Sequence, residues 1–224
     1  MALAAEGYKV GLLDADIFGP SLPKMFGLEG EELFMHTVDG RNLIIPAEAY
    51  GVKMLSIGFL IDPSSAAVWR GAMASNALKQ LIEQADWGEL DYFLIDMPPG
   101  TSDIHLTLVQ TLGLTGTVVV TTPQKVALAD ARKGIAMFRN ESINVPVLGI
   151  VENYSYLECP DCGKHISVFG ESHVDEVAAH YELPVLAKLP IDPKLAEAVD
   201  AGKIEDAKLP DALSGALSTV EGLL

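Results

Sequence analysis

The stretch Tyr92-Phe-Leu-Ile-Asp-Met-Pro-Pro-Gly-Thr-Ser-Asp103 decides the fold class of this chain. Its first half is a run of four apolar residues that ends on the carboxylate of Asp96, which predicts a short buried strand of a parallel sheet. Pro98, Pro99 and Gly100 then stop the strand and force a shaped loop at its carboxyl end. In open α/β sheets this is the edge where ligands bind.

A second segment, Asp14-Ala-Asp-Ile-Phe-Gly-Pro-Ser21, repeats the same pattern after an apolar run. Parallel strands share their carboxyl edge, so we expect Asp16 and Asp96 on one rim of the sheet. Carboxylates at such a rim suit a divalent metal ion or phosphoryl transfer. The alternative for either residue is a solvated Asp in a turn or at the start of a helix, because both places are rich in this residue.

The composition limits the possible partners. The chain has 224 residues, enough for one well-buried α/β domain. Its 31 acidic and 15 basic residues give a formal net charge of -16, which repels nucleic-acid phosphates and anionic lipids. No apolar run reaches the length of a membrane span, and the first residues lack the basic region of a secretory signal. Two cysteines make no disulfide framework, so we expect a cytoplasmic protein in a reducing compartment, with neither nucleic acid nor membrane as a partner.

Strands and helices alternate along the whole chain, without repeats or a linker, which predicts a single doubly wound α/β domain over residues 1–224. Residues 1–6 are expected to be the second half of a helix, and Asp39-Gly40 to be the turn of a hairpin. The expected strands are 8–14, 53–59, 92–96, 116–121, 147–151 and 185–189. The expected helices are 74–84, 104–112, one ending near 138, 172–180 and two more before the C-terminus.

The motif Cys159-Pro-Asp-Cys162-Gly163 is the most specific local signal. Such a turn points two thiolates at one metal, while Gly lets backbone N–H groups approach the sulfurs. A redox dithiol is the first alternative, but that motif opens a helix directly after a strand, and here Tyr154 to Glu158 intervenes. A pair of inert buried thiols is the second.

The number of ligands separates the remaining metal hypotheses. Tetrahedral zinc and a four-iron cluster each take about four ligands, and this chain has two cysteines. His165 and His173 are candidates to complete a zinc site within one chain. Otherwise a second copy supplies another cysteine pair, and the metal lies across a symmetric homodimer interface. We favour the homodimer.

Several motifs are spread over the chain: Gly11-Leu-Leu-Asp-Ala-Asp-Ile-Phe-Gly-Pro-Ser21, Trp69-Arg-Gly71, Trp87-Gly88 with Leu90-Asp91-Tyr92, Asp96-Met-Pro-Pro-Gly-Thr-Ser-Asp103, Thr121-Thr-Pro-Gln124, Asn153 and Cys159-Pro-Asp-Cys162. In these motifs the chain resembles the Mrp/ApbC family of MinD-like P-loop ATPases, which carry iron–sulfur clusters. The resemblance runs over essentially the whole chain. It implies ATP-dependent delivery of a cluster to apo iron–sulfur proteins.

The resemblance also implies roles for individual residues. Asp16 would lie in switch I beside Mg²⁺ and the attacking water, Asp96 would be the Walker B acid, and Gly100 would belong to switch II. Asn153 would flank the adenine of ATP together with the segment Leu189-Pro190-Ile191-Asp192. Cys159 and Cys162 would hold half of a bridging [4Fe-4S] cluster, and the cysteine insertion would lie near residues 154–170.

One departure from the family pattern concerns the phosphate loop. No G-x-x-x-x-G-K-[ST] occurs in the chain, although that loop supplies the amides and lysine that hold phosphates. We therefore expect the family fold without its first strand and phosphate loop, in a chain deficient in ATP binding. The strands beside the missing one would lose a partner. Two further functions stay open: a metal-binding module without ATPase activity, and a positioning ATPase of the MinD/ParA type.

Overall fold

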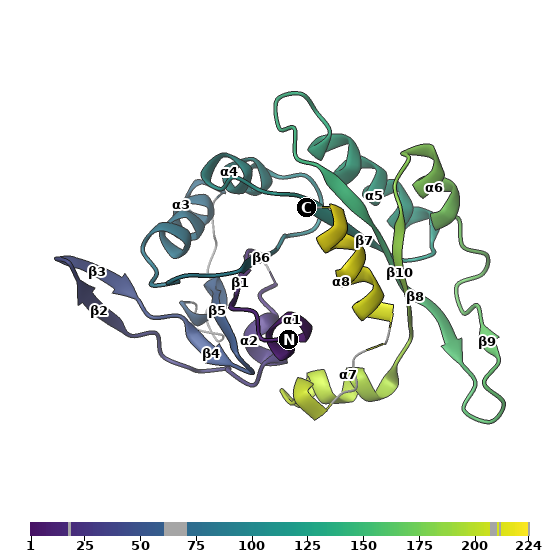
Figure 1. Ribbon diagram of the computed structural model, residues 1–224, viewed down its shortest axis with the longest axis horizontal. Coiled ribbons are helices and arrows are strands. Elements are labelled where there is room, and N and C mark those ends of the chain that lie inside the picture. The colour runs from purple at the N-terminus through teal and green to yellow at the C-terminus, as the bar shows by residue number, and fades with distance from the viewer. Residues whose placement is uncertain (18, 61–70, 207–209, 211, 224) are drawn as a thin grey trace. The chain divides into compact units, whose positions relative to one another are not determined.

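The computed structural model describes all residues except 18, 61–70, 207–209, 211 and 224. The chain folds as two compact units (Figure 1). Unit 1 is formed by Met1–Thr111 with Lys194–Lys208, and unit 2 by Leu112–Pro193 with Leu209–Leu224. Each unit contains its own mostly parallel sheet, so the predicted α/β class is confirmed. The extent of the domain as one body over 1–224 stays a prediction.

The sheet of unit 1 has the strand order β4-β5-β1-β6, in which β5, β1 and β6 are parallel and β4 is antiparallel to β5. The strands are β1 (Val10–Asp14), β4 (Ala47–Ala49), β5 (Val52–Ser56) and β6 (Tyr92–Asp96). In this register Asp14 lies beside Ser56 on one side and Asp96 on the other. The carboxyl ends of the three parallel strands are therefore lined with polar side chains.

Two helices, α3 (Gly71–Glu83) and α4 (Asp103–Thr111), pack together over the core of unit 1. Their apolar residues bury Leu13 and Leu55 of the sheet beneath Leu78 and Leu108, and all four side chains are inaccessible to solvent. Burial of this size is the main stabilising contribution to the unit, at roughly 1.5–3 kcal/mol for each large side chain. This packing holds in place the sheet whose carboxyl edge carries the polar rim formed by Asp14, Ser56 and Asp96.

The smaller elements of this part of the chain are α1 (Ala2–Ala5), α2 (Leu22–Met25), the antiparallel pair β2 (Met35–Val38) and β3 (Arg41–Ile44), η1 (Ile57–Phe59), α7 (Pro193–Asp200) and η2 (Ile204–Asp206). The expected hairpin turn is present: Asp39 has φ 50° and Gly40 φ 76°. Both angles are in the left-handed region that an Asp-Gly turn between antiparallel strands requires.

Unit 2 has the strand order β10-β8-β7, all parallel, with a short antiparallel strand β9 against the far end of β8. Helices pack on both faces of this sheet, as a doubly wound fold requires. The elements are β7 (Thr117–Thr121), α5 (Lys125–Phe138), β8 (Val147–Glu158), β9 (His165–Ile166), α6 (Val174–His180), β10 (Val185–Pro190) and α8 (Ala212–Leu223).

Two element boundaries differ from the sequence prediction. The strand expected over 53–59 ends at Ser56, and the residues that follow to Phe59 form η1, because the Ser56 side chain caps that turn by accepting the Gly58 N–H at 2.9 Å. The strand expected over 147–151 continues to Glu158. Its last two residues, Leu157 and Glu158, pair with β9, a partner that the apolar pattern alone does not reveal.

Strands β6 and β7 each lie at an edge of their sheets. Among the described residues β6 pairs only with β1, and β7 only with β8. Residues 2–5 form helix α1 and add no strand to β6. Leu94 on β6 is 41% exposed. An exposed apolar edge is a template for pairing with another chain.

We therefore predict that the chain self-associates through the edge of β6 and that Leu94→Lys reduces this association several-fold, because lysine at a strand edge opposes edge-to-edge pairing. Sedimentation velocity over a range of concentrations measures the effect. Leu106→Lys is the matched control, since Leu106 on α4 is 40% exposed but lies on a helix. Equal effects of the two substitutions would exclude the strand edge as the contact.

Candidate functional site

Asp14 is the buried centre of the polar rim in unit 1. Its side chain is inaccessible to solvent, and its oxygens accept three hydrogen bonds. Ser56 Oγ donates at 2.9 Å, the Asp16 N–H at 3.1 Å and the Leu22 N–H at 3.4 Å. Burial raises the pKa of Asp14, while these hydrogen bonds oppose the rise and the charge of Asp96 adds to it. Asp14 therefore holds the loop after β1 in place.

The two carboxylates that the sequence predicts for this rim lie near one another. Desolvation raises the pKa of Asp96, and the negative charge of Asp16 raises it further. The backbones of the two loops are also joined, since the Ala15 N–H donates to the Asp96 carbonyl at 2.9 Å. Asp16 Oδ1 accepts the Gly19 N–H at 3.3 Å. Repulsion between two carboxylates on one rim is the kind of charge arrangement that a cation relieves.

The loop after Asp96 is closed by a buried histidine of α4. His105 Nδ1 accepts the Ser102 N–H at 3.1 Å, and the ring also hydrogen-bonds the Pro98 carbonyl. A neutral imidazole has one acceptor and one donor nitrogen, so a single ring holds both ends of the loop. Gly100, at the tip of the loop, has φ 85°, which is in the left-handed region that glycine adopts without steric cost. His105 thus fixes the loop to which the predicted switch residue belongs.

In unit 2 the carboxyl ends of the strands form a second polar edge. Thr121, Glu152 and Lys188 lie side by side in the register of β7, β8 and β10. Glu152 is fully buried, and among the described residues neither of its oxygens accepts a hydrogen bond. Lys188 Nζ lies 3.7 Å from Glu152 Oε2 and 2.6 Å from Asp175 Oδ2. The hydrogen bond to Asp175 is the main cause of a raised Lys188 pKa, to which the charge of Glu152 also contributes.

The residues predicted to flank a nucleotide base also lie at this edge of unit 2. Asn153 follows Glu152 on β8, and its Oδ1 accepts the N–H of Tyr154 at 3.0 Å. Pro190 is the last residue of β10 and lies beside Tyr156 in the strand register. Asp192 follows two residues later in the chain. All three therefore lie in unit 2, on or just after the adjacent strands β8 and β10.

The two cysteines lie at the tip of a hairpin formed by the end of β8 and β9. The Gly163 N–H donates to the Cys159 carbonyl at 2.9 Å, which closes the turn, and the Cys159 N–H donates to Lys164 O at 3.0 Å. Cys159 is half-buried, Cys162 is exposed, and both are free thiols. Backbone N–H groups of Asp161 and Cys162 lower the Cys159 pKa, as a metal-binding thiolate requires.

The zinc site within one chain that His165 and His173 were candidates to complete is not assembled. In the described part of the chain no group of three or more His, Cys, Asp or Glu side chains is arranged to hold a metal ion. His165 instead stacks on Tyr156 with ring centroids 3.9 Å apart, and His173 pairs with Glu176 at 3.1 Å. The cysteine pair therefore presents two thiolates without further ligands from these histidines.

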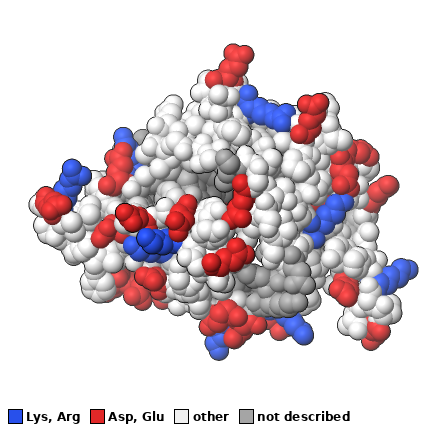
Figure 2. Space-filling view, in the orientation of Figure 1, with Lys and Arg blue, Asp and Glu red and all other residues white. Residues whose placement is uncertain are grey.

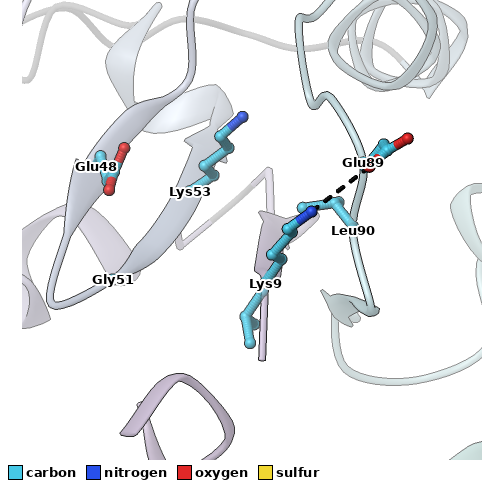
Figure 3. A pocket seen from close by; sticks show the side chains of 7 residues that line it. Lys9, Glu48, Gly51, Lys53, Glu89 and Leu90 are labelled. Carbon is cyan, nitrogen blue, oxygen red and sulfur yellow. Dashed lines mark hydrogen bonds and ion pairs between the residues drawn. The ribbon is translucent and has the colours of Figure 1, made fainter. Parts of the chain in front are cut away.

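A cavity of about 390 Å³ opens at the opposite, amino edge of the unit 1 sheet (Figure 3). Its lining comes from residues that precede or begin strands: Lys9, Val10, Glu48, Gly51, Lys53, Glu89 and Leu90. Lys9 pairs with Glu89 at 3.5 Å, and Lys53 Nζ donates to the Trp87 carbonyl at 2.9 Å. Since both lysines are engaged within the protein, this cavity offers little to an anionic ligand.

The surface charge agrees with the composition. On the face shown in Figure 2, acidic side chains are spread over the surface and Lys and Arg lie among them. Across the described residues, none of the helices is both long and apolar enough to span a lipid bilayer.

Comparison with known proteins identifies the family. A model of the ParA family, described as NUBPL iron-transfer P-loop NTPase, matches residues 1–220. The chain belongs to this family. An iron-sulfur cluster carrier protein of Aquifex aeolicus is 48% identical over 213 residues, and one of Escherichia coli K12 is 49% identical over 202 residues. The iron-sulfur cluster transfer protein NUBPL of Mus musculus is 43% identical over 205 residues.

These relatives are longer proteins. The match covers 95% of this chain but 57% of the Aquifex protein, and 90% of this chain but 53% of the Escherichia coli protein. For the mouse protein the two shares are 91% and 62%. The chain therefore spans little more than half the length of these relatives.

Solved structures support the fold. A nucleotide-binding protein from Archaeoglobus fulgidus in complex with ADP, with cobalt found, has a TM-score of 0.79 and 38% identity, and the match covers 95% of this chain and 81% of that one. The MinD cell division protein of Aquifex aeolicus has a TM-score of 0.62 at 22% identity, and the match covers 99% of this chain and 86% of that one. At this level of identity the likeness shows the fold alone. The predicted MinD-like P-loop NTPase fold is thereby confirmed.

Sequence reasoning located the rim but missed residues that hold it. Trp69 and Arg70 of the Trp-Arg-Gly motif lie outside the described residues. The sequence pattern selects Asp16 for the rim and not Asp14. Asp14 is nevertheless the last residue of a strand that the apolar run predicts to be buried, and this position indicates a buried carboxylate. His105 and Glu152 carried no such signal, because their roles depend on neighbours that only the fold supplies.

The lowered pKa of His105 gives a prediction for stability. Burial is its main cause. The unfolded chain, with a histidine pKa of about 6.5, binds this proton more readily than the folded chain, so the contribution is present above that pH and is lost as pH falls below it. We expect His105→Gln, which keeps a donor and an acceptor, to reduce the loss of thermal stability between neutral and mildly acidic pH.

Differential scanning calorimetry at a series of pH values measures this effect. The exposed His180 supplies the control variant His180→Gln. A profile for His105→Gln that is parallel to the profile of the unmodified chain would exclude His105 as the titrating group.

Proposed function

We propose that this chain is an iron–sulfur cluster carrier that binds a [4Fe-4S] cluster between two copies and delivers it to apo iron–sulfur proteins. The single observation that carries the proposal is the hairpin with Cys159 and Cys162. Two accessible thiols, one with a lowered pKa, meet at an exposed turn. The names of the relatives, cluster carrier and cluster transfer proteins, support the same cargo.

The number of thiolates supports the homodimer. A four-iron cluster takes about four cysteine ligands, and each chain supplies two. The exposed tip of the hairpin leaves room for a second copy, and Ile166, Val168 and Phe169 beside it are exposed apolar side chains of the kind that dimer interfaces bury. The symmetric arrangement needs no ligand from outside the two chains.

The part of a nucleotide site that this chain provides is the carboxylate rim. Asp16 and Asp96 of unit 1 offer oxygen ligands for Mg²⁺, with the Gly100 loop beside them. Separately, Asn153, Pro190 and Asp192 of unit 2 offer contacts for a base. In relatives of this fold, Mg²⁺ neutralises phosphate charge when bound. Within this chain, Asp14 and His105 would hold the loops that carry these groups. The proposal places the protein in the cytoplasm. It assigns ATP hydrolysis to the family type and expects this chain itself to be deficient in ATP binding.

A metal-binding module without ATPase activity is the second candidate. One observation favours it: the 224 residues contain no G-x-x-x-x-G-K-[ST] loop to bind the phosphates. The two candidates share the cysteine hairpin and differ only in their response to nucleotide. The Cys-x-x-Cys hairpin argues against the third, a positioning ATPase, because such a function gives the thiols no role.

Replacement of either cysteine tests the cargo. We predict that anaerobic reconstitution with iron and sulfide gives the chain a broad visible absorbance. Cys159→Ala and Cys162→Ala are each expected to abolish nearly all of it, because each substitution leaves the dimer with two of the four cysteine ligands that the cluster takes. Absorbance spectra with iron and sulfide analysis measure the result.

His165→Ala is the matched control, since His165 lies on the same hairpin but supplies no ligand in the proposed site. It is expected to keep the absorbance. A cluster that survives in both cysteine variants, or that is lost in His165→Ala, would contradict the proposed ligand set.

The nucleotide response of this chain is predicted from the absent phosphate loop. We expect Mg·ATP to bind more weakly than millimolar, because a rim of carboxylates without backbone amides and lysine repels a triphosphate. Isothermal titration calorimetry measures the affinity. A low-micromolar Kd that Asp96→Asn weakens would overturn this expectation and restore the ATP-dependent carrier as the description of the chain itself.

A further inference from the structure

The hairpin of β2 and β3 forms a two-stranded sheet of its own, which projects from the rest of unit 1 (Figure 1). It is fastened at its base, where the Ile44 N–H donates to the Gln84 carbonyl at 2.7 Å and the Asp86 N–H donates to the Ile44 carbonyl at 2.8 Å. These bonds occupy part of the outer edge of β3. Among the described residues β2 pairs only with β3, so the outer edge of β2 is an unpaired strand edge. A two-stranded hairpin gains stability when a third strand is added to it.

The register shows which backbone groups lie on the unpaired edge. The Ile45 N–H donates to the Phe34 carbonyl at 2.8 Å, so these residues form a hydrogen-bonded pair at the start of the ladder. Hydrogen-bonded and non-hydrogen-bonded pairs alternate along antiparallel strands. Met35 and Thr37 therefore belong to non-hydrogen-bonded pairs, and their N–H and C=O groups point away from β3. An added strand would meet a row of donors and acceptors there.

Exposed apolar side chains accompany this edge. Phe34 is 63% exposed, and Val38 and Ile45 are also exposed. Side chains two or four residues apart on a strand lie on the same face, and Ile45 lies opposite Phe34, so the three share one face of the hairpin. An unpaired edge beside an apolar face provides both main-chain pairing and side-chain contacts for an extended polypeptide.

The charges around the edge indicate the kind of polypeptide. Glu29, Glu31 and Glu32 precede β2 and Asp39 follows it, and all four are exposed. Arg41 is the one Lys or Arg in this stretch of the sequence. Pairing of two copies of the chain through β2 would bring these carboxylates together, and like charges across strands are destabilising. A segment that carries Lys or Arg would instead meet charges of opposite sign.

We propose that the outer edge of β2 binds an extended segment of a partner protein in which apolar and basic residues alternate. The backbone of the segment pairs with Met35 and Thr37, and its apolar side chains cover the face that carries Phe34 and Val38. Its basic side chains lie near the acidic residues at both ends of β2. The edge belongs to unit 1 and the cysteine hairpin to unit 2, so this binding requires neither a cluster nor a nucleotide.

Short synthetic peptides test the proposal on the chain without a cluster. A labelled peptide in which valine and lysine alternate is expected to bind, by fluorescence anisotropy, several-fold more tightly than a peptide in which serine and lysine alternate. It is also expected to slow hydrogen exchange over residues 34–38, measured by mass spectrometry. Equal affinity for the two peptides would show attraction by net charge alone and would overturn the proposal.

A pair of proline substitutions tests which edge of the hairpin binds. Thr37→Pro removes an N–H from the outer edge of β2 and is expected to weaken binding of the valine–lysine peptide several-fold. Asn42→Pro is the matched control, because Asn42 lies directly opposite Thr37 and its N–H points to the other edge. Both substitutions lose the hydrogen bond from Thr37 Oγ1 to Asn42 Oδ1 at 2.8 Å. Equal effects would overturn the assignment to β2.

A serine substitution tests the apolar face without changing the backbone. Val38→Ser is expected to weaken binding of the valine–lysine peptide, whereas Val126→Ser, at an exposed valine of α5, is expected to leave it unchanged. Equal affinities of the two variants would contradict the role of this face.

Sedimentation velocity without peptide detects the competing occupant, a second copy of the chain. Self-association that Thr37→Pro abolishes and Asn42→Pro preserves would assign the edge to a second copy and overturn the proposal. Cluster reconstitution is a separate measurement, so its failure is distinguishable from failure of peptide binding.

Discussion

Parallel pairing of the strands is the constraint on which the rest of this structure depends. Because parallel strands bring their carboxyl ends to one edge, residues far apart in the chain, such as Asp14 and Asp96, become neighbours. The same rule gathers Glu152 and Lys188 in unit 2. A buried carboxylate is costly there unless it is hydrogen-bonded, and the Ser56 hydroxyl and two backbone N–H groups meet this need for Asp14.

The cysteine hairpin extends the sheet of unit 2, because one of its two strands is the end of β8. Strand β8 lies between β7 and β10 up to Glu152 and pairs with β10 again at Tyr156. Its last two residues, Leu157 and Glu158, pair with β9. Its length therefore joins a polar rim to a pair of thiols within one unit.

Much of the fold was predictable from local patterns. Apolar runs that end in Asp predicted β1 and β6, and Asp39-Gly40 predicted the turn between β2 and β3, because these signals act through nearby residues. The part of β8 beyond Val151 was not predicted, because its pairing at Tyr156 with β10 and at Leu157 and Glu158 with β9 depends on segments that come later in the chain.

The candidate site was predictable only in part, because some of its residues acquire their roles from segments that are distant in the sequence. Residue type and position at a strand end sufficed to select Asp16 and Asp96. The importance of His105 comes from the Pro98 carbonyl and the Ser102 N–H, which its ring meets only after α4 has packed on the sheet. Glu152 reads in the sequence as an ordinary charged residue, and its burial beside Lys188 is a product of the strand order.

The central claim is that one chain provides half the ligands of a shared cluster. Native mass spectrometry of the anaerobically reconstituted chain tests it most directly, because it reports the number of chains and the metal content of the same particle. The account predicts a dimer that carries one [4Fe-4S] cluster. A monomer that retains its metal, or a dimer without a cluster, would contradict it.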